Sequence, residues 1–297
     1  MKNSNVTKRV NSQFVAGDNL NSALDIISDL HSKGFQTSLN YLGESVESIQ
    51  MARLAAQEYS NGLSEISRLN LNSTVSVKLT QLGIDLDEDL CYDLMVNLLE
   101  KAKQHNTLIR IDMENTPYTD KTIDLYWRLR DNYDNIGLVL QSYLYRTEND
   151  LNFLIMIGGS VRIVKGAYSE SDANAMVEKK SVSENYIKLL DMVMSSELIN
   201  TKLFLAIATH DKQIINKTIS LADDKGLKKG QFEFQMMYGI REDLQKDTLN
   251  KGFPVRVYVP YGSSWYPFLI RRLAERPANL FLFLKCLKPP RTEIKTL

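Results

Sequence analysis

Short runs of β-branched and aromatic residues alternate along this chain with longer amphipathic segments, and this alternation is what most constrains the fold. Eight runs have the pattern of a β-strand, at residues 36–41, 75–79, 108–112, 137–140, 160–164, 203–208, 231–234 and 255–259. Helical patterns follow at 45–59, 87–104, 119–132, 149–156, 183–195, 212–225 and 241–251, and another begins at Trp265. Eight strand–helix units of this kind are typical of a closed (β/α)8 barrel, the TIM barrel of the α/β class.

The length of 297 residues suits one barrel of about 250 residues with appendages. We expect residues 1–30 to form an N-terminal helical arm, 31–290 the barrel domain and 291–297 a C-terminal tail. A short terminal helix at 278–287 should stop at Pro289 and Pro290. About forty residues separate the fifth and sixth strands, which predicts a long functional loop at 166–180. An open doubly wound sheet is the competing fold, but its G-x-G-x-x-G nucleotide signature is absent.

Composition excludes several classes of protein. Lys plus Arg and Asp plus Glu both number 36, so the formal charge is zero, which argues against a nucleic-acid binder. Cys91 and Cys286 are not part of a CxxC or Cys/His cluster, so we expect no metal site and require no disulfide. The start of the chain lacks the apolar core of a signal peptide, and no apolar run is long enough to span a bilayer. We therefore expect a cytoplasmic protein.

Polar residues stand at or just beyond the end of each predicted strand. They are Asn40, Glu44, Lys78, Asp112, Gln141, Arg162, Lys165, Thr209, His210, Glu233 and Tyr258. The carboxyl ends of barrel strands meet at one rim, which is where the active sites of such barrels lie. Charged groups there are costly to bury unless they are paired or bind a ligand. The pattern predicts a polar site at the mouth of the barrel.

The helix after the last strand adds Arg271, Arg272 and Glu275 to that rim. A guanidinium matches a carboxylate in both geometry and charge. Arg271 and Glu275 are four residues apart and share a helix face, whereas Arg272 lies about 100° round the helix. This arrangement suits a small molecule that carries both a carboxylate and an amine.

Each of these features also has a purely structural explanation. Lys78 and Asp112 can form an ion pair between neighbouring strands, and Thr209–His210–Asp211 can be a helix-capping turn. Glu275 and Arg271 can be a surface helix pair, and Tyr168 and Tyr258 can be packing aromatics. Arg162 is harder to explain in this way, because a barrel strand rarely carries an arginine without a partner.

Taken together, short motifs over residues 36–285 resemble the proline dehydrogenase family, the flavoenzymes of proline catabolism. The motifs are LGE at 42–44, VSVKL at 75–79, IDME at 111–114, VLQSY at 139–143, RIVKGAY at 162–168, ATH at 208–210, FEFQMMYG at 232–239, YVPYG at 258–262 and RRLAE at 271–275. The length is similar to that of the monofunctional bacterial enzymes rather than the large proline utilization A fusions.

The resemblance implies a distorted (β/α)8 barrel with the last helix over its mouth. It implies that Arg271, Arg272 and Lys78 bind the carboxylate of L-proline and that Glu275 supports this basic cluster. Asp112 would pair with Lys78, Tyr258 and Met237 would pack against the proline ring, and Glu44 would form a gate with an active-site arginine. The product would be 1-pyrroline-5-carboxylate.

The resemblance also implies FAD, bound without a covalent link. Arg162 would lie near flavin N5 and Gln141 near the edge of the isoalloxazine. The residues expected to line the rest of the cofactor are Val164, Lys165, Gly166, Tyr168, Lys180, Thr209, His210 and Glu233. Electrons would pass to a quinone, which implies a peripheral contact with the inner face of the membrane.

Phe268 departs from the family pattern, since the position three residues before Arg271 is commonly Tyr. The ring can still wall the substrate, but the hydroxyl is missing. A hydrogen bond that it would make is lost, at a cost of about 1 kcal/mol. We therefore expect this position to affect the discrimination between proline and hydroxyproline rather than the reaction class.

Three alternatives share the barrel. The first is a metal-free aldolase or other carboxylate-binding lyase that uses Lys78 as a Schiff base. The second is a proline-responsive binding or regulatory protein, and the third is a catalytically silent relative. A yellow protein with flavin absorbance would separate the dehydrogenase from a colourless lyase.

Overall fold

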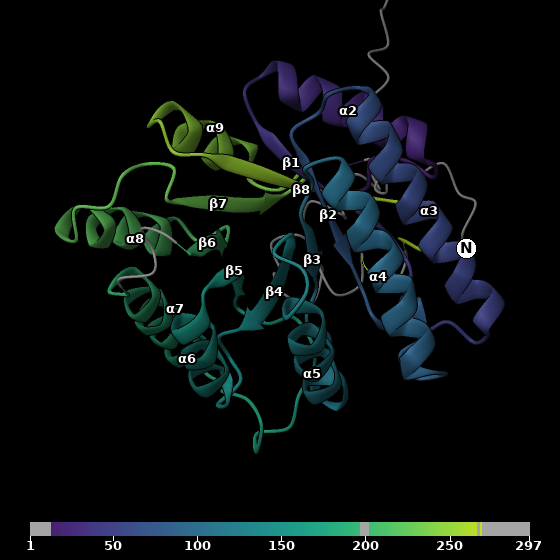
Figure 1. The fold of residues 1–297 in the computed structure, drawn as a ribbon. Helices are drawn as coiled ribbons and strands as arrows, with labels where there is room; N and C mark the ends of the chain where they lie inside the picture. The colour runs from purple at the N-terminus through teal and green to yellow at the C-terminus, as the bar shows by residue number, and fades with distance from the viewer. Residues whose placement is uncertain (1–12, 197–201, 266–267, 269–297) are drawn as a thin grey trace, which may run out of the picture.

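Eight parallel strands close into a barrel in the computed structural model, which describes residues 13–196, 202–265 and 268 (Figure 1). The strands are β1 Gln36–Tyr41, β2 Ser73–Val77, β3 Ile109–Ile111, β4 Ile136–Gln141, β5 Gly159–Val164, β6 Leu203–Ala208, β7 Phe232–Met237 and β8 Val255–Tyr261. Each strand pairs with the next, and β8 closes the ring against β1, with Val259 opposite Leu39. The predicted (β/α)8 barrel is confirmed.

Helices follow the first seven strands and surround the barrel (Figure 1). They are α3 Ile49–Arg68, α4 Glu88–Gln104, α5 Thr119–Arg130, α6 Thr147–Ile157, α7 Lys179–Met194, α8 Lys212–Asp224 and α9 Glu242–Asn250. Ser48, Asp87 and Asp211 cap three of them by accepting hydrogen bonds from first-turn amides, which fixes where these helices begin.

The helix α3 extends nine residues beyond the predicted end at Tyr59. Gly62 lies in its interior, although glycine disfavours helix. A Cβ at Gly62 would lie 2.9 Å from a methyl of Leu39 on β1. The glycine therefore lets the helix pack closely on the barrel wall.

The predicted N-terminal arm contains α2 Leu20–Ser32, which packs against both β1 and β8. Its buried face is formed by Ala23, Leu24, Ile27 and Leu30. This helix covers the seam where the barrel closes and lies beside α3 (Figure 1). In a regular barrel the helix after the eighth strand covers that seam.

The strands divide into an apolar outer face and a polar interior. Residues such as Val75, Ile109, Ile111 and Val257 point toward the helices and belong to one hydrophobic core. The interior instead contains buried polar side chains, among them Ser38, Ser76, Arg110, Arg162, Glu233 and Arg256. Hydrogen bonds join strands that are not neighbours, as from Arg162 on β5 to Ser76 on β2, so these side chains meet across the barrel. A typical TIM barrel is filled by branched apolar side chains.

The mouth of the barrel is closed on one side by a small apolar cluster. Phe14 and Val15, Leu42, Ile240, and Trp265 and Phe268 pack together there. Beyond β8, Trp265 and Phe268 thus pack at the mouth.

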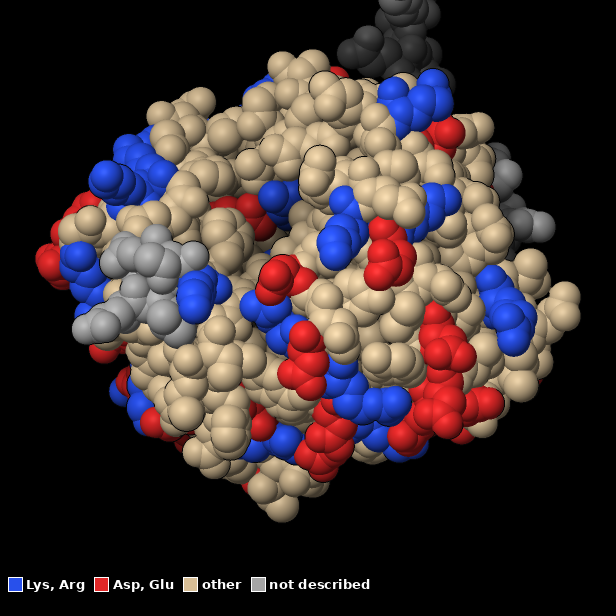
Figure 2. Space-filling model, in the orientation of Figure 1, with Lys and Arg blue, Asp and Glu red and all other residues tan. Residues whose placement is uncertain are grey.

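Acidic and basic side chains are interspersed on the face of the molecule that Figure 2 shows. This distribution fits the zero formal charge of the sequence. Among the described helices, none combines the length and apolar character that a membrane span needs.

Candidate active site

A cavity of about 660 Å³ opens at the carboxyl ends of the strands. Its size is within the range of small-molecule and cofactor sites. The apolar part of its wall includes Met113, Val139, Tyr143, Val164, Tyr168, Met176, Ala208, Met237, Ile240 and Phe268. Its charged groups are Lys78, Arg162, Lys165 and Lys179 against Asp112 and Asp211. The described wall therefore suits a largely apolar ligand that carries negative charge.

Asp112 organises the floor of the cavity. Its carboxylate lies 3.3 Å from the ammonium of Lys78 and 2.8 Å from the guanidinium of Arg162. The hydroxyl of Tyr258 donates a 2.7 Å hydrogen bond to the same carboxylate. The predicted pairing of Lys78 with Asp112 is present. The three partners of Asp112 come from different parts of the barrel: Lys78 follows β2, Arg162 is on β5 and Tyr258 is on β8.

These contacts control protonation on the cavity floor. Burial alone would raise the pKa of Asp112, but Lys78, Arg162 and the Tyr258 hydroxyl together hold it below its usual value. Burial and the adjacent Asp112 charge raise the pKa of Tyr258 well above its usual value. At neutral pH the floor thus has an ionised carboxylate and a phenol that still donates its proton.

Arg162 also contacts the ring of Tyr258, with its guanidinium carbon 5.4 Å from the ring centroid. Cation–π contacts occur at this separation. Its second nitrogen donates to Ser76 at 3.0 Å. Arg162 is thereby fixed by three different groups, and its side chain is almost fully buried.

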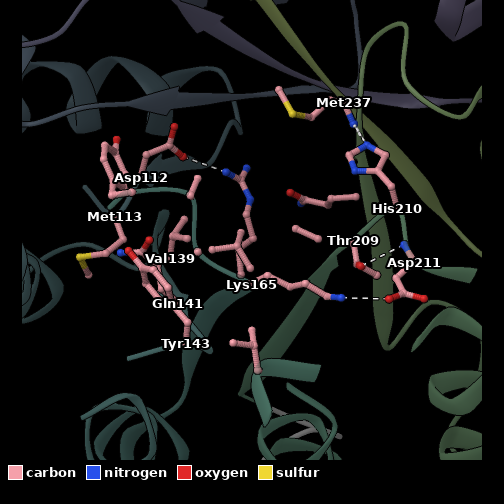
Figure 3. Close-up of a pocket in the computed structure, with 18 of the residues that line it drawn as sticks. Asp112, Met113, Val139, Gln141, Tyr143, Lys165, Thr209, His210, Asp211 and Met237 are labelled. Atoms are coloured by element: carbon pink, nitrogen blue, oxygen red, sulfur yellow. Dashed lines mark hydrogen bonds and ion pairs between the residues drawn. The ribbon is translucent and has the colours of Figure 1, made fainter. Parts of the chain in front are cut away.

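A second ion pair lies on another side of the cavity, between Lys165 and Asp211 at 2.9 Å (Figure 3). Lys165 also donates to Ser183 on α7. Asp211 caps α8 by accepting from the amide of Gln213, and its own amide donates to Thr209. The capping explanation of this turn is correct for Asp211, but the capping residue also anchors a lysine of the cavity wall.

His210 accepts a 2.8 Å hydrogen bond at Nε2 from the backbone amide of Met237 (Figure 3). Because that nitrogen accepts, the proton of a neutral imidazole is on Nδ1. This contact links the end of β6 to the end of β7.

Gln141 is oriented by Glu114. The amide nitrogen of Gln141 donates to the backbone oxygen of Glu114 at 2.9 Å, which leaves its amide oxygen as an acceptor. The Glu114 carboxylate in turn accepts from the amide and the hydroxyl of Thr80, two residues after Lys78. Burial raises the pKa of Glu114, and the Thr80 contacts oppose that shift.

Gly166 stands at a close approach of the backbone to an aromatic ring. Its φ of +114° is one that other residues rarely adopt, and an added Cβ would lie 2.4 Å from Tyr143. Both residues line the cavity. A side chain at Gly166 would therefore change the shape of the cavity wall.

Most residues predicted to hold the flavin lie together in this cavity. They are Gln141, Arg162, Val164, Lys165, Gly166, Tyr168, Thr209 and His210. Two others do not line it. Lys180 has an exposed side chain that lies 3.8 Å from Glu184, and the preceding Lys179 lines the cavity instead. Glu233 is buried in the barrel interior, where it pairs with Arg256 at 2.7 Å.

The residues predicted to hold the substrate divide into three groups. Lys78, Asp112, Met237, Tyr258 and Phe268 line the same cavity as the flavin set. Glu44 lines a smaller neighbouring cavity of about 370 Å³, which shares Lys78 and Phe268 with the first. The remaining three, Arg271, Arg272 and Glu275, lie outside the described residues.

The sequence alone did not identify Asp211, Tyr143 and Lys179 as cavity residues. Tyr143 was part of a motif but had no assigned role, and Asp211 was explained by capping. The sequence predicts Lys180 as a cofactor residue, but its neighbour Lys179 lines the cavity. One residue along a helix changes the direction of a side chain by about 100°. The N-terminal position of Lys179 on α7, where the long loop after β5 ends, was the available signal.

Comparisons with known proteins agree with the fold and the sequence motifs. A protein-family model described as proline dehydrogenase matches residues 23–281. The chain is 40% identical to proline dehydrogenase 2 of Bacillus subtilis over 273 residues, which cover 92% of this chain and 88% of that protein. It is 35% identical to the proline dehydrogenase of Deinococcus radiodurans over 90% of this chain and 86% of that protein.

The fold is also similar to solved structures. The crystal structure of proline utilization A from Bdellovibrio bacteriovorus superposes with a TM-score of 0.85 at 20% identity. The match covers 98% of this chain but only 36% of that larger chain. A sequence identity of 20% supports the similarity of fold alone. The family model and the curated relatives, at 35–40% identity, support membership of a family. On their combined strength, the chain belongs to the proline dehydrogenase family.

Proposed function

We propose that this chain oxidises L-proline to 1-pyrroline-5-carboxylate with a non-covalently bound FAD. The observation that carries this proposal is the Asp112-centred floor of the cavity. There Lys78, Arg162 and Tyr258 converge on one ionised carboxylate beneath an apolar wall. Few small molecules need a fixed cationic cluster beside an apolar ring-sized surface, and a cyclic amino acid next to a planar cofactor is one such pair.

The described residues fit FAD in volume and in charge. The cavity is large enough for a ring system, its walls are mostly apolar, and its cations outnumber its anions. We assign Arg162, Gln141, Val164, Lys165, Gly166, Tyr168, Thr209 and His210 to the cofactor, and we leave Lys180 and Glu233 out of this set. When bound, the flavin supplies a two-electron acceptor for carbon–hydrogen oxidation.

The residues of the chain then bind and orient the substrate. Lys78, with Arg271 and Arg272 from the last helix, would bind the carboxylate, and Glu275 would support the arginines. Met237, Tyr258 and Phe268 would hold the ring, which fixes C5 for transfer of a hydride. Glu44 would act from the neighbouring cavity as part of a gate.

The oxidation removes a hydride from C5 and a proton from the amine, so that a C=N bond forms. The amine must be neutral when the hydride leaves, because its lone pair forms the new bond. A cationic pocket disfavours the ammonium form by like-charge repulsion. The same cluster that binds the carboxylate would thus promote loss of the amine proton, without a dedicated general base.

The electrons must leave for a second acceptor, and we propose a quinone at a membrane surface that the protein contacts peripherally from the cytoplasm. This part of the proposal rests on membership of the family.

The lyase alternative is less well supported by the geometry. A Schiff base requires a neutral nucleophilic amine. Lys78 instead lies in an ion pair with the Asp112 carboxylate, 3.3 Å away, so its amine is already engaged by a partner.

The test is to purify the chain, measure its bound flavin and incubate it with L-proline and a soluble quinone. We expect a yellow protein that produces 1-pyrroline-5-carboxylate, detected by mass spectrometry. A colourless protein that borohydride links covalently to a carbonyl substrate at Lys78 would support the lyase and contradict the dehydrogenase.

A further inference from the structure

Below the cavity floor, the interior of the barrel holds more positive charge than negative. Four cationic side chains are buried at the floor or deeper: Lys78 and Arg162, which line the cavity, and Arg110 and Arg256, which do not. They face the carboxylates of Glu233, which is buried, and of Asp112, whose side chain is 13% exposed. The buried carboxylate of Glu114, which interacts with Lys78, adds a third anion, and the cations of this described region still outnumber its anions.

Arg110 is the cation without a counter-ion. Its guanidinium donates only to neutral oxygens, those of the Leu138 and Ser160 backbones and the Ser160 hydroxyl. Its Nε has no hydrogen-bond partner. Within the described part of the chain it forms no ion pair, although its side chain is almost fully buried.

The barrel makes room for this unpaired charge. A Cβ at Gly137 on β4 would lie 2.8 Å from Nη1 of Arg110, so the glycine leaves the space that the guanidinium fills. Burial and the nearby Arg162 lower the pKa of Arg110 to about 9, so it remains charged at neutral pH. A buried charge without a counter-ion costs stability, and such a cost is most often retained at functional sites.

Arg256 lies at a similar depth but is neutralised. Its guanidinium donates to both oxygens of Glu233, at 2.7 and 3.0 Å. It also donates to the Thr37 carbonyl and to Gln36, so its position does not depend on Glu233 alone. The two arginines thus form a natural comparison, one with a carboxylate partner and one without.

We propose that the unpaired charge of Arg110 raises the reduction potential of the flavin that binds above it. Glu233 opposes this effect by neutralising Arg256. Two-electron reduction adds negative charge to the isoalloxazine, and a fixed positive charge beneath the ring favours that change. This inference rests on the proposed function and concerns how strongly the cofactor accepts electrons, not which substrate is oxidised.

The expected size of the shift in reduction potential follows from the distance between Arg110 and the proposed flavin site. Arg110 is on β3, two residues before Asp112, and is therefore about 7 Å farther from the mouth than Asp112 along the extended backbone. At a separation on the order of 10 Å and an effective dielectric constant of about 20, one charge changes an equilibrium constant roughly tenfold. For a two-electron couple a tenfold change corresponds to about 30 mV.

Arg110 also ties β3 to β5 through Ser160, so a purely structural role must be distinguished. The test uses two substitutions with opposite charge effects, Arg110→Gln and Glu233→Gln. Structural damage would lower stability in both variants and has no reason to shift the potential in opposite directions. Arg68→Gln removes an exposed positive charge on α3 as a control.

The measurement is the midpoint potential of the flavin in each purified holoenzyme, by equilibration with reference dyes. The dissociation constant of sulfite, which adds to flavins as an anion, provides a second measurement. We expect Arg110→Gln to lower the potential and weaken sulfite binding roughly tenfold, and Glu233→Gln to do the reverse. Arg68→Gln should remain close to the unsubstituted protein.

Shifts of the same sign in Arg110→Gln and Glu233→Gln, or values unchanged in both, would overturn the inference. If Arg110→Gln does not fold, Glu233→Gln alone decides, since only a rise agrees with the proposal. Failure of the proposed function is a different result. In that case the unsubstituted protein would hold no flavin, or its flavin would not respond to L-proline.

Discussion

Arg162 on β5 and Asp112, immediately after β3, form a 2.8 Å ion pair across the interior of the barrel. The two residues belong to strands that are not neighbours, so only the closed barrel brings them together. The same carboxylate also binds Lys78 and Tyr258. These mutual contacts hold the floor of the cavity in one geometry, and such preorganisation is what electrostatic catalysis requires.

Asp112→Asn tests that floor. The substitution keeps the shape of the side chain but removes the charge that holds Lys78 and Arg162. A hydrogen bond to a charged group is worth roughly 1.5–3 kcal/mol, so we expect kcat/KM for L-proline to fall about tenfold or more. Steady-state kinetics provides the measurement, with Asp89→Asn on the exposed surface of α4 as the control. Equal kinetics in both variants would remove Asp112 from the site.

The same residue predicts a pH dependence of stability. The pKa of Asp112 is lower in the folded protein than in the unfolded chain, where it is about 3.9. Its contribution is therefore fully present above pH 4 or so and is lost as the pH falls through the folded pKa. Urea unfolding at several pH values, of the unsubstituted protein and of the Asp112→Asn variant, measures this contribution to the free energy of unfolding. The difference in unfolding free energy should shrink at acidic pH, and a difference that grows there would contradict the assignment.

Gly166→Ala should weaken FAD binding. The new Cβ would lie 2.4 Å from the Tyr143 ring, so one of these two cavity-lining groups must shift. Gly230→Ala is a matched control, because Gly230 has a nearly equal φ of +112° but nothing within 4 Å of the added Cβ. Both variants place an alanine at nearly the same positive φ, but only Gly166→Ala meets a cavity-lining ring, so only it should lose flavin. We expect its FAD dissociation constant to rise about tenfold, the effect of roughly 1.4 kcal/mol.

Fluorescence titration of the apoprotein with FAD measures this constant. If Gly230→Ala loses flavin to the same degree, the effect comes from strain and not from the cavity wall.

Phe268→Tyr should change the preference between L-proline and 4-hydroxyproline. Phe268 is buried and lines both the main cavity and the smaller one that contains Glu44. A hydroxyl there adds a polar group where the substrate ring is expected to lie. One hydrogen bond from this hydroxyl is worth about 1 kcal/mol. The ratio of kcat/KM values for the two substrates is the measurement, and Phe153→Tyr on the exposed face of α6 is the control. An unchanged ratio would show that Phe268 only packs.

Arg271→Met and Arg272→Met test the part of the site that lies outside the described residues. The paired guanidiniums predict a carboxylate clamp, and loss of one charged hydrogen bond should raise KM for L-proline about tenfold or more. FAD should remain bound, as its absorbance in the purified variants would show. Unaltered proline kinetics would remove the clamp from the account.

The barrel could be predicted from the sequence because the evidence for it is local. The alternation of strand and helix patterns gave all eight strands, and β1 and β6 agree with their predicted limits. The rim could be predicted for the same reason, since polar residues such as Lys78, Asp112 and Gln141 follow buried strands directly. Family motifs then added roles to these positions.

Other features depend on geometry that no local pattern contains. Glu233 occurs in a motif with cavity residues, but its partner Arg256 is 23 residues away in sequence and draws it into the barrel interior. The interior position of Arg110 depends on its contacts with Gly137 and Ser160, which come from other strands and cannot be predicted from the local sequence. Lys179 and Lys180 are both lysines at a helix start, and only the exact helical phase decides which one faces the cavity.

The central claim is that a flavin bound at the mouth of this barrel accepts electrons from L-proline. Anaerobic titration of the purified protein with L-proline, followed by flavin absorbance, tests it most directly. The account predicts that the yellow colour bleaches stoichiometrically and returns when a quinone is added. A flavin spectrum that does not change with L-proline, or a protein that binds no flavin, would contradict it.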